Sequence, residues 1–217
     1  MTDLQLYITE VFASVQGETS LTGLPTTFIR LASCNLRCSW CDTTYSFGRG
    51  TPASIEHLVL EAENNGCQFV CITGGEPLLQ PYVHQLIDKL LHHGYVISLE
   101  TGGSLPIHEV DSRVLIILDI KCPGSGMSHK NHWENLHIIT KKDEIKFVLT
   151  NEEDYIYAKE ICLKYNLFKK TPHILLSPVH GVLDPQILVG WILRDKLQVR
   201  LNLQVHKYIW TPTTQGV

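Results

Sequence analysis

The sequence predicts an α/β fold, a modified and incomplete (β/α) barrel built on a parallel sheet. Short apolar segments of strand length alternate along the chain with amphipathic segments of helical length, as in a parallel sheet covered by helices. Polar and glycine-rich turns repeatedly follow the apolar segments. The 217 residues are few for a complete eight-unit barrel of about 250 residues, so we expect an open barrel in a single domain, residues 1–217.

The expected strands are apolar runs bounded by turn residues, and the expected helices begin next to capping residues or proline. We expect strands over 26–32, 68–73, 95–99, 115–120, 145–149, 174–177 and 199–205. We expect helices over 55–65, 77–93, 152–165 and 186–193. Ser54 and Asn151 are suitable N-caps for two of them, and Pro77 suits a first helical turn. The C-terminal ends of parallel strands carry the site in such folds, so the polar turns should converge on one mouth.

The composition is that of a globular protein, with 44% hydrophobic and 18% charged residues. The formal net charge of −4 disfavours direct binding to nucleic acid, because proteins that grip a phosphate backbone are usually basic. No basic segment followed by an apolar run opens the chain, and no stretch approaches the ~20 apolar residues of a membrane span. Seven cysteines, three of them at metal-binding spacing, indicate reduced thiols rather than disulfides. We therefore expect a cytoplasmic protein with no membrane partner.

Three closely spaced cysteines dominate the predicted chemistry. Cys34, Cys38 and Cys41 are separated by three and then two residues. As zinc ligands they would need a fourth partner, such as another cysteine or a histidine. As ligands of a four-iron cluster they need none, because the fourth iron stays open for a small molecule. The spacing favours the cluster over zinc.

Two motifs resemble those of the radical S-adenosylmethionine enzymes. The first is the cysteine stretch itself, with the aromatic Trp40 just before its last cysteine. The second is Thr73-Gly74-Gly75-Glu76-Pro77, which resembles the glycine-glycine-glutamate element after the second barrel strand. Glycine permits close backbone approach, and a glutamate accepts hydrogen bonds from a cationic amine. The resemblance implies that the cofactor's methionine chelates the open iron, and that the reduced cluster cleaves the cofactor to a 5′-deoxyadenosyl radical.

Further motifs narrow the resemblance to the family of 7-carboxy-7-deazaguanine synthases, from about residue 8 to the C-terminus. They are Val15-Gln16-Gly17-Glu18, Arg30, Cys41-Asp42-Thr43, Glu100-Thr101-Gly102, residues 118–126 and residues 204–210. This resemblance implies a lyase that converts 6-carboxy-5,6,7,8-tetrahydropterin to 7-carboxy-7-deazaguanine with loss of ammonia, in queuosine-type 7-deazapurine biosynthesis. It also implies that hydrogen taken from C6 of the substrate returns from 5′-deoxyadenosine, so that S-adenosylmethionine is reused.

The resemblance assigns roles by position. It implies that Cys34, Cys38 and Cys41 bind a 4Fe-4S cluster and that Thr43 helps to hold Mg2+. The implied contacts to S-adenosylmethionine are Trp40, Asp42, Gly75, Glu76, Asp119, Ile120, Lys121, Ser177 and His180. The implied contacts to the pterin are Val15, Gln16, Gly17, Glu18, Arg30, Thr73, Glu100, Gln204, His206 and Val217. Among these, Arg30 is the natural partner of the substrate's carboxylate, by a bidentate pair.

The resemblance also implies partners. The cluster would receive one electron at low potential from a flavodoxin or ferredoxin, and the protein would be a homodimer. Two other hypotheses remain open. One is a different radical enzyme, such as a glycyl-radical activase, which acts on a protein and consumes its cofactor. The other is a non-catalytic iron-sulfur or zinc protein that serves in electron transfer or structure.

Overall fold

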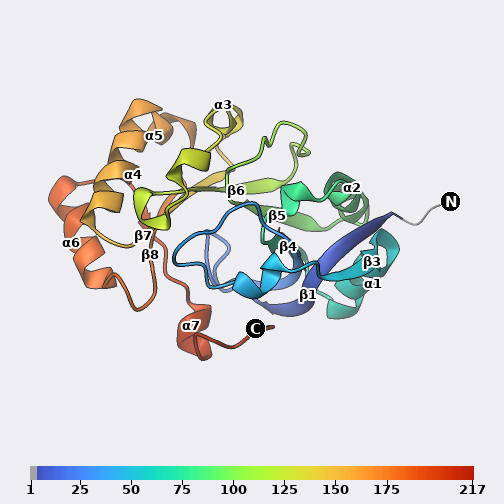
Figure 1. The fold of residues 1–217 in the computed structure, drawn as a ribbon. Coiled ribbons are helices and arrows are strands. Elements are labelled where there is room, and N and C mark those ends of the chain that lie inside the picture. The colour runs from blue at the N-terminus through green and yellow to red at the C-terminus, as the bar shows by residue number, and fades with distance from the viewer. Residues whose placement is uncertain (1–3) are drawn as a thin grey trace.

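The structure, a computed structural model, describes residues 4–217 and is built on one nine-stranded sheet (Figure 1). The strands are β1 (Gln5–Val15), β2 (Pro25–Leu31), β3 (Thr51–Ser54), β4 (Phe69–Gly74), β5 (Val96–Thr101), β6 (Leu115–Ile120), β7 (Glu144–Leu149), β8 (Ile174–Pro178) and β9 (Arg200–Leu201). Their order is β3-β1-β2-β4-β5-β6-β7-β8-β9. All pairs from β2 to β9 are parallel, whereas β1 is antiparallel to both β2 and β3. The sheet of the described chain ends at β3 and β9, so the predicted incomplete barrel is confirmed.

The helices follow the strands as the alternating pattern predicted. They are α1 (Ile55–Asn65), α2 (Val83–His92), α3 (Asn135–Ile138), α4 (Glu152–Lys164), α5 (Leu167–Lys170), α6 (Pro185–Asp195) and α7 (His206–Ile209), with 3-10 turns η1 (Thr44–Phe47), η2 (Pro77–Leu79), η3 (Pro123–Ser125) and η4 (Ser128–Lys130). Both predicted caps are confirmed, because Ser54 accepts from the third helical amide of α1 and Asn151 from that of α4. Between residues 4 and 217, no helix has the length and apolar character needed to cross a membrane.

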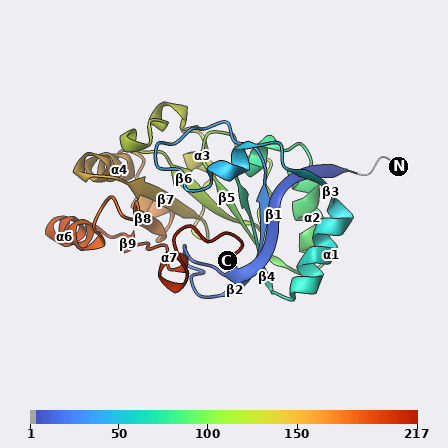
Figure 2. The same ribbon diagram turned by 60° about the horizontal axis from the view of Figure 1, so that its bottom comes forward.

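The strands separate a hydrophobic core from a polar interior by simple alternation. On β7, the side chains of Ile145, Phe147 and Leu149 pack in the core under the helices, whereas Lys146 and Val148 line a cavity. The larger helices lie on the outside of the curved sheet, and the C-terminal segment lies on its inner side (Figure 2). The outer face of the sheet therefore packs against the helices in the hydrophobic core, and the inner face carries the residues of the site.

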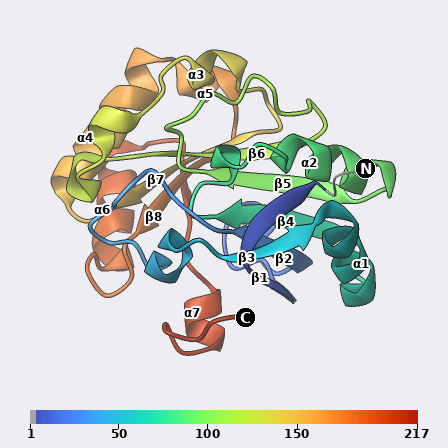
Figure 3. The same ribbon diagram turned by 45° about the vertical axis from the view of Figure 1, so that its right-hand side comes forward.

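Two predicted elements differ from the structure, and the strands β1 and β3 were not among the expected ones. The helix expected over 77–93 is broken between η2 and α2, because Pro81 disfavours helical backbone at Gln80, which is extended there. The side chain of Gln80 then bonds the backbone of Tyr7 and Ala32. The strand expected over 199–205 is only two residues long, and the chain then turns into α7, which projects from the body of the molecule (Figure 3). The short edge strand β3 follows the cysteine loop where no strand was expected.

Candidate active site

A cavity of about 710 Å3 opens at the C-terminal ends of the parallel strands, where the polar turns were expected to converge. Its lining includes the predicted residues Val15, Gln16, Gly17, Glu18, Arg30, Cys34, Cys38, Trp40, Cys41, Asp42, Thr43, Thr73, Gly75, Glu100, Asp119, Lys121, Ser177, His180, Gln204, His206 and Val217. Two predicted residues, Glu76 and Ile120, do not line it. Ile120 packs in the core, because it alternates with Asp119 along β6, so only its backbone is near the cavity edge.

One side of the cavity, here called the thiol wall, consists of Cys34, Cys38, Cys41, Trp40 and Gly75. Main-chain bonds hold the cysteine loop: the Ser33 amide donates to Ser46 at 2.7 Å and the Ser39 amide to Ser125 at 3.1 Å. The guanidinium of Arg37 donates to two carbonyl oxygens of the same loop, at 2.8 and 2.6 Å, and lies over the ring of Phe47. The loop is therefore fixed before any ligand is bound.

The three thiols fit a cluster. Burial raises the pKa of Cys34 and of Cys38, so these thiols favour the protonated form until a metal binds them. Among residues 4–217, no group of three His, Cys, Asp or Glu side chains forms a ready-made site for one ion. A multi-iron cluster spreads its thiolates over separate irons, and all three cysteines reach the same cavity.

Gly75 and Glu76 join the thiol wall to the sheet. A β-carbon at Gly75 would overlap the Ser33 carbonyl and the Cys34 side chain, so only glycine permits this approach. The carboxylate of Glu76 accepts from the Thr101 hydroxyl at 2.9 Å and the Gly102 amide at 2.8 Å, and it is fully buried. Burial raises the pKa of Glu76. The Glu76 side chain therefore braces the turn after β5, and it is the backbone at Gly75 that faces the cavity.

A second part of the cavity lining, here called the charged wall, consists of Glu10, Glu18, Arg30, Glu100 and Lys146. Arg30 Nε donates to Glu10 Oε1 at 2.7 Å, and the Tyr45 hydroxyl donates to the same oxygen at 3.0 Å. Burial and the Glu10 carboxylate raise the pKa of Tyr45 to about 12, so it stays a donor. The rings of Phe12 and Phe28 stack at a centroid distance of 5.0 Å and line the same cavity.

The deepest charges come from three different elements. Lys146 Nζ on β7 lies 3.1 Å from Glu18 Oε2, in the loop after β1. Glu18 also accepts from the side-chain amides of Gln204 and Asn202, at 2.9 and 3.4 Å. Glu100 Oε1 on β5 accepts from Gln16 Nε2 at 3.3 Å. Residues distant in the sequence thus form one polar network around the predicted substrate position.

A second ion pair borders the thiol wall. Lys121 Nζ lies 3.0 Å from Asp119 Oδ2 and 5.1 Å from the centre of the Trp40 ring. Burial would lower the pKa of Lys121, but Asp119 raises it above its usual value. The other oxygen of Asp119 and the indole nitrogen of Trp40 are buried without a hydrogen-bond partner in the described chain. Two polar atoms at the cavity edge are therefore free to receive a bound molecule.

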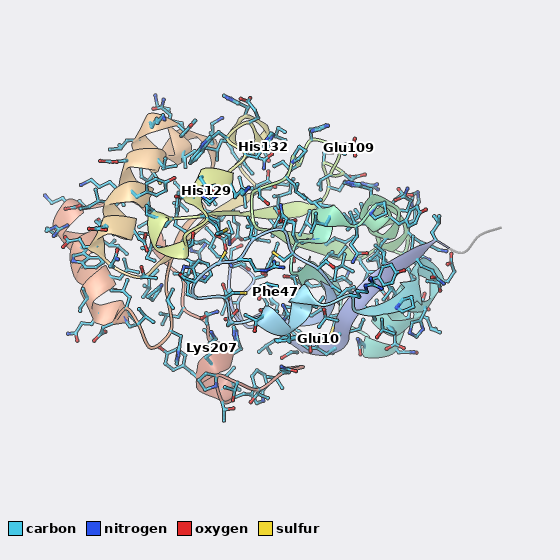
Figure 4. The ribbon with its side chains drawn as sticks, in the orientation of Figure 1. Glu10, Phe47, Glu109, His129, His132 and Lys207 are labelled. Atoms are coloured by element: carbon cyan, nitrogen blue, oxygen red, sulfur yellow. The ribbon has the colours of Figure 1, made fainter. Side chains whose placement is uncertain are left out.

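The C-terminal segment closes the remaining side. Lys207 Nζ on α7 donates to Asp42 Oδ2 at 2.7 Å and links α7 to the cysteine loop. Desolvation opposes the ionisation of Asp42, but Lys207 and Gln204 outweigh it and lower its pKa to about 2. His206 packs against Gly17, and burial lowers the pKa of its imidazole. Glu10 on β1, Phe47 on η1 and Lys207 on α7 all line the cavity (Figure 4).

Sequence reasoning missed Glu10, Tyr45, Lys146 and Lys207. Lys146 had a usable signal, because a lysine inside an otherwise apolar strand must face a polar interior or pair with an acid. Lys207 lies in the motif over residues 204–210, but its partner Asp42 depends on the position of α7. Glu10 had no signal, since its partner is set by the pairing of β1 with β2.

Comparison with known proteins identifies the family. A model of the radical SAM superfamily matches residues 29–120. The chain is 42% identical over 226 residues to 7-carboxy-7-deazaguanine synthase from Koribacter versatilis, covering 98% of this chain and 100% of that relative. It is 42% identical over 219 residues to the enzyme of that name from Chlorobaculum tepidum, covering 100% and 99%. The chain belongs to the 7-carboxy-7-deazaguanine synthase family.

Membership of the 7-carboxy-7-deazaguanine synthase family confirms the prediction of a radical S-adenosylmethionine enzyme in deazapurine biosynthesis. It implies a 4Fe-4S cluster and S-adenosylmethionine as cofactors. The fold also matches that of QueE from Escherichia coli, a crystal structure, with a TM-score of 0.75 and 24% identity over 92% of this chain and 93% of that chain. The incomplete barrel expected from the sequence is therefore the fold of a solved structure.

Proposed function

We propose that the chain converts 6-carboxy-5,6,7,8-tetrahydropterin to 7-carboxy-7-deazaguanine with loss of ammonia. The observation that carries this proposal is a single cavity with cysteine thiols on one wall and a paired, buried arginine with two carboxylates on the other. All atoms of the substrate are recovered in the product and ammonia, so the net reaction needs no external oxidant. This balance is consistent with a cofactor that is reused.

The thiol wall would hold the cofactors. Cys34, Cys38 and Cys41 fit a 4Fe-4S cluster with one open iron, and S-adenosylmethionine bound there supplies a 5′-deoxyadenosyl radical. The free oxygen of Asp119 can accept from hydroxyl groups, and the backbone at Gly75 leaves room for a close approach. We assign the Ser177 and His180 contacts to the same ligand, because both residues line the cavity beyond Asp119.

The charged wall would bind the pterin. Glu10 occupies Nε of Arg30, which leaves the terminal guanidinium nitrogens to pair with the substrate's carboxylate. Carboxylates at Glu18 and Glu100 accept from the N–H groups of the pterin ring, and the stacked pair Phe12 and Phe28 offers an apolar surface beside it. Gln16, Gly17, Thr73, Gln204, His206, Val15 and Val217 line the remaining space.

Mg2+ would bind at Thr43, next to the last cysteine. The Thr43 hydroxyl lies 3.1 Å from Asp42 Oδ1, and both residues line the cavity between the two walls. One hydroxyl beside one carboxylate suits a hard cation that keeps most of its water ligands. Thr43 would hold the ion, which would supply a positive charge to orient the substrate's oxygen atoms.

The proposed radical chemistry also implies partners and a cellular compartment. We propose a flavodoxin or ferredoxin as electron donor, a homodimer of single-domain chains, and no direct contact with nucleic acid. The single continuous sheet supports one domain. All seven cysteines are free thiols, which supports a reducing compartment such as the cytoplasm.

One assay tests the proposal against its rivals. Anaerobically reconstituted protein with S-adenosylmethionine, Mg2+ and a chemical reductant should turn over the carboxytetrahydropterin, with many product molecules formed per S-adenosylmethionine lost. Consumption of one cofactor per event without deazaguanine would indicate another radical enzyme, such as an activase. If cluster-loaded protein formed neither the product nor 5′-deoxyadenosine, the assignment as an enzyme would be refuted.

A further inference from the structure

Lys146 is a buried cation in the middle of the charged wall. It lies on β7 between Ile145 and Phe147, which face the core, and alternation directs its side chain to the cavity. The residue is 8% exposed, and its ammonium forms an ion pair with Glu18 at 3.1 Å. A charge in this position is retained only if its partners outweigh the cost of burial.

The groups around Lys146 are mostly acidic. Glu18 in the β1–β2 loop, Glu100 on β5 and Asp119 on β6 each raise the pKa of the Lys146 ammonium, although burial opposes this, so the residue stays cationic. Further charges line the same cavity: Arg30 on β2, Asp42 in the cysteine loop, Lys121 on β6, His206 and Lys207 at α7. Asp119 already has its own partner in Lys121, at 3.0 Å. Among these acidic groups in the described chain, Lys146 forms its ion pair with Glu18, and Glu100 lines the same cavity.

The Glu18 carboxylate depends on that cation. Two acidic groups in one cavity repel each other, and without compensation one of them keeps its proton. Burial raises the pKa of Glu100 and Glu18 adds to this effect, whereas Lys146, Arg30 and the thiol of Cys71, which donates to Glu100 at 3.5 Å, oppose it. Burial also acts on Glu18, but Lys146 and Gln204 prevail and its pKa is lowered. Loss of the ammonium, which lies 3.1 Å from Glu18, would therefore raise the pKa of Glu18.

We propose that Lys146 is a positioning residue that keeps Glu18 ionised beside Glu100, so that Glu18 accepts hydrogen bonds from the N–H groups of the substrate ring. This inference rests on the proposed pterin substrate. A protonated carboxyl has one acceptor oxygen fewer and presents a donor to another donor, so its contact with an N–H group is lost. The role of Lys146 is thus to set the charge of a substrate-binding group without itself touching the reacting atoms.

The test is the pH dependence of kcat/KM for the reconstituted holoenzyme with saturating S-adenosylmethionine, comparing wild type, Lys146→Met and Lys146→Arg. In Lys146→Met the acid limb should move to higher pH by about one unit or more, which lowers kcat/KM about tenfold at a pH below both limbs. The loss should shrink as pH rises, because the Glu18 carboxylate then ionises unaided. Lys146→Arg should restore most of the wild-type profile, since it keeps the charge.

Cluster absorbance serves as the folding control, because Lys146 is not one of the thiol-wall residues. If kcat/KM of Lys146→Met fell by the same factor at every pH, the proposal would be overturned, and direct contact of Lys146 with the substrate would be indicated. An acid limb at the same pH in Lys146→Met as in the wild type would also overturn the proposal. If the wild-type protein formed no deazaguanine product, the proposed function itself would be refuted. Failure of the proposed function is therefore distinguishable from failure of the role of Lys146.

Glu100→Gln provides a matched second background. Here Glu18 no longer shares the cavity with the Glu100 carboxylate, although Asp42 remains, so adding Lys146→Met should shift the limb upward by less than it does in the native background. The double variant, Glu100→Gln with Lys146→Met, removes one negative and one positive charge. If Lys146→Met alone does not fold, the proposal is tested by comparing this double variant with Glu100→Gln. No shift between Glu100→Gln and the double variant would contradict the role of Lys146 toward Glu18.

Discussion

The two walls of the cavity are held in different ways. The thiol wall is fixed by main-chain hydrogen bonds and by the close approach of Gly75, and few of its positions depend on a charge. The charged wall is fixed by ion pairs between side chains, such as Arg30 with Glu10 and Lys146 with Glu18. A radical source needs a constant position, whereas a polar substrate needs charges of the correct sign. The four predictions below probe this contrast.

The largest effect is expected for Cys38→Ala. An iron that loses its thiolate leaves the cluster incomplete, so cluster-dependent absorbance and turnover should disappear together. Anaerobic reconstitution with iron and sulfide, followed by absorbance and product assays, measures both. Cys67→Ala, at a cysteine outside the cavity, is the matched control and should retain both. Activity retained in Cys38→Ala would refute the cluster assignment.

The next effect concerns the substrate's carboxylate. Arg30→Gln removes a charge-assisted bidentate pair worth about 2–3 kcal/mol, so kcat/KM should fall about 100-fold, mainly through KM. Glu10→Gln should act in the same direction but less, because it only releases Nε of Arg30. Steady-state kinetics with intact cluster separates the two constants. A fall in kcat at unchanged KM would show that Arg30 does not bind the substrate in its ground state.

A smaller effect is expected at the proposed magnesium site. Thr43→Val removes one oxygen ligand while the ion keeps its water ligands, so about tenfold more Mg2+ should be needed for half-maximal activity. Titration of chelator-treated enzyme with Mg2+ measures this, with cluster absorbance as a check. Thr44→Val is the neighbouring control and should titrate as wild type. An identical Mg2+ requirement in Thr43→Val would count against the assignment.

The smallest effect is expected for Lys207→Met. Its ion pair with Asp42 is partly exposed to solvent, so kcat/KM should fall only about two- to fivefold. The difference from wild type should shrink as salt is added, because an exposed pair is screened. Lys207→Arg should behave as wild type. A loss larger than that of Arg30→Gln would mean that α7, rather than the sheet, holds the substrate.

Local signals in the sequence predicted most of the fold. Apolar runs located the parallel strands, and Ser54 and Asn151 located two helix starts, because capping depends on neighbouring residues alone. Two errors had different causes. The break at Gln80 follows from Pro81, a local signal that the prediction of one helix over 77–93 did not use. The early end of β9 accompanies distant contacts, because the side chain of Asn202 bonds Ser177 and the backbone of Thr19.

The residues of the site also divide into those with a local sequence signal and those whose partners lie far away in the sequence. The cysteines, Thr43 and the residues around Gly75 lie in short motifs, and the sequence alone brought them to attention. Lys146 and Glu10 lie in strands, where their partners depend on which strands are neighbours. The motifs therefore predicted the thiol wall almost completely, whereas the pairing within the charged wall required the three-dimensional structure.

The contact between Gly17 and His206 has a consequence for how related sequences can vary. A β-carbon at position 17 would overlap the imidazole of His206, and the amide of Val205 donates to the carbonyl of Gly17 at 2.8 Å. A larger residue at position 17 is therefore compatible only with a smaller one at 206. These two positions, at opposite ends of the chain, should covary among homologues, and a substitution at one should select a compensating change at the other.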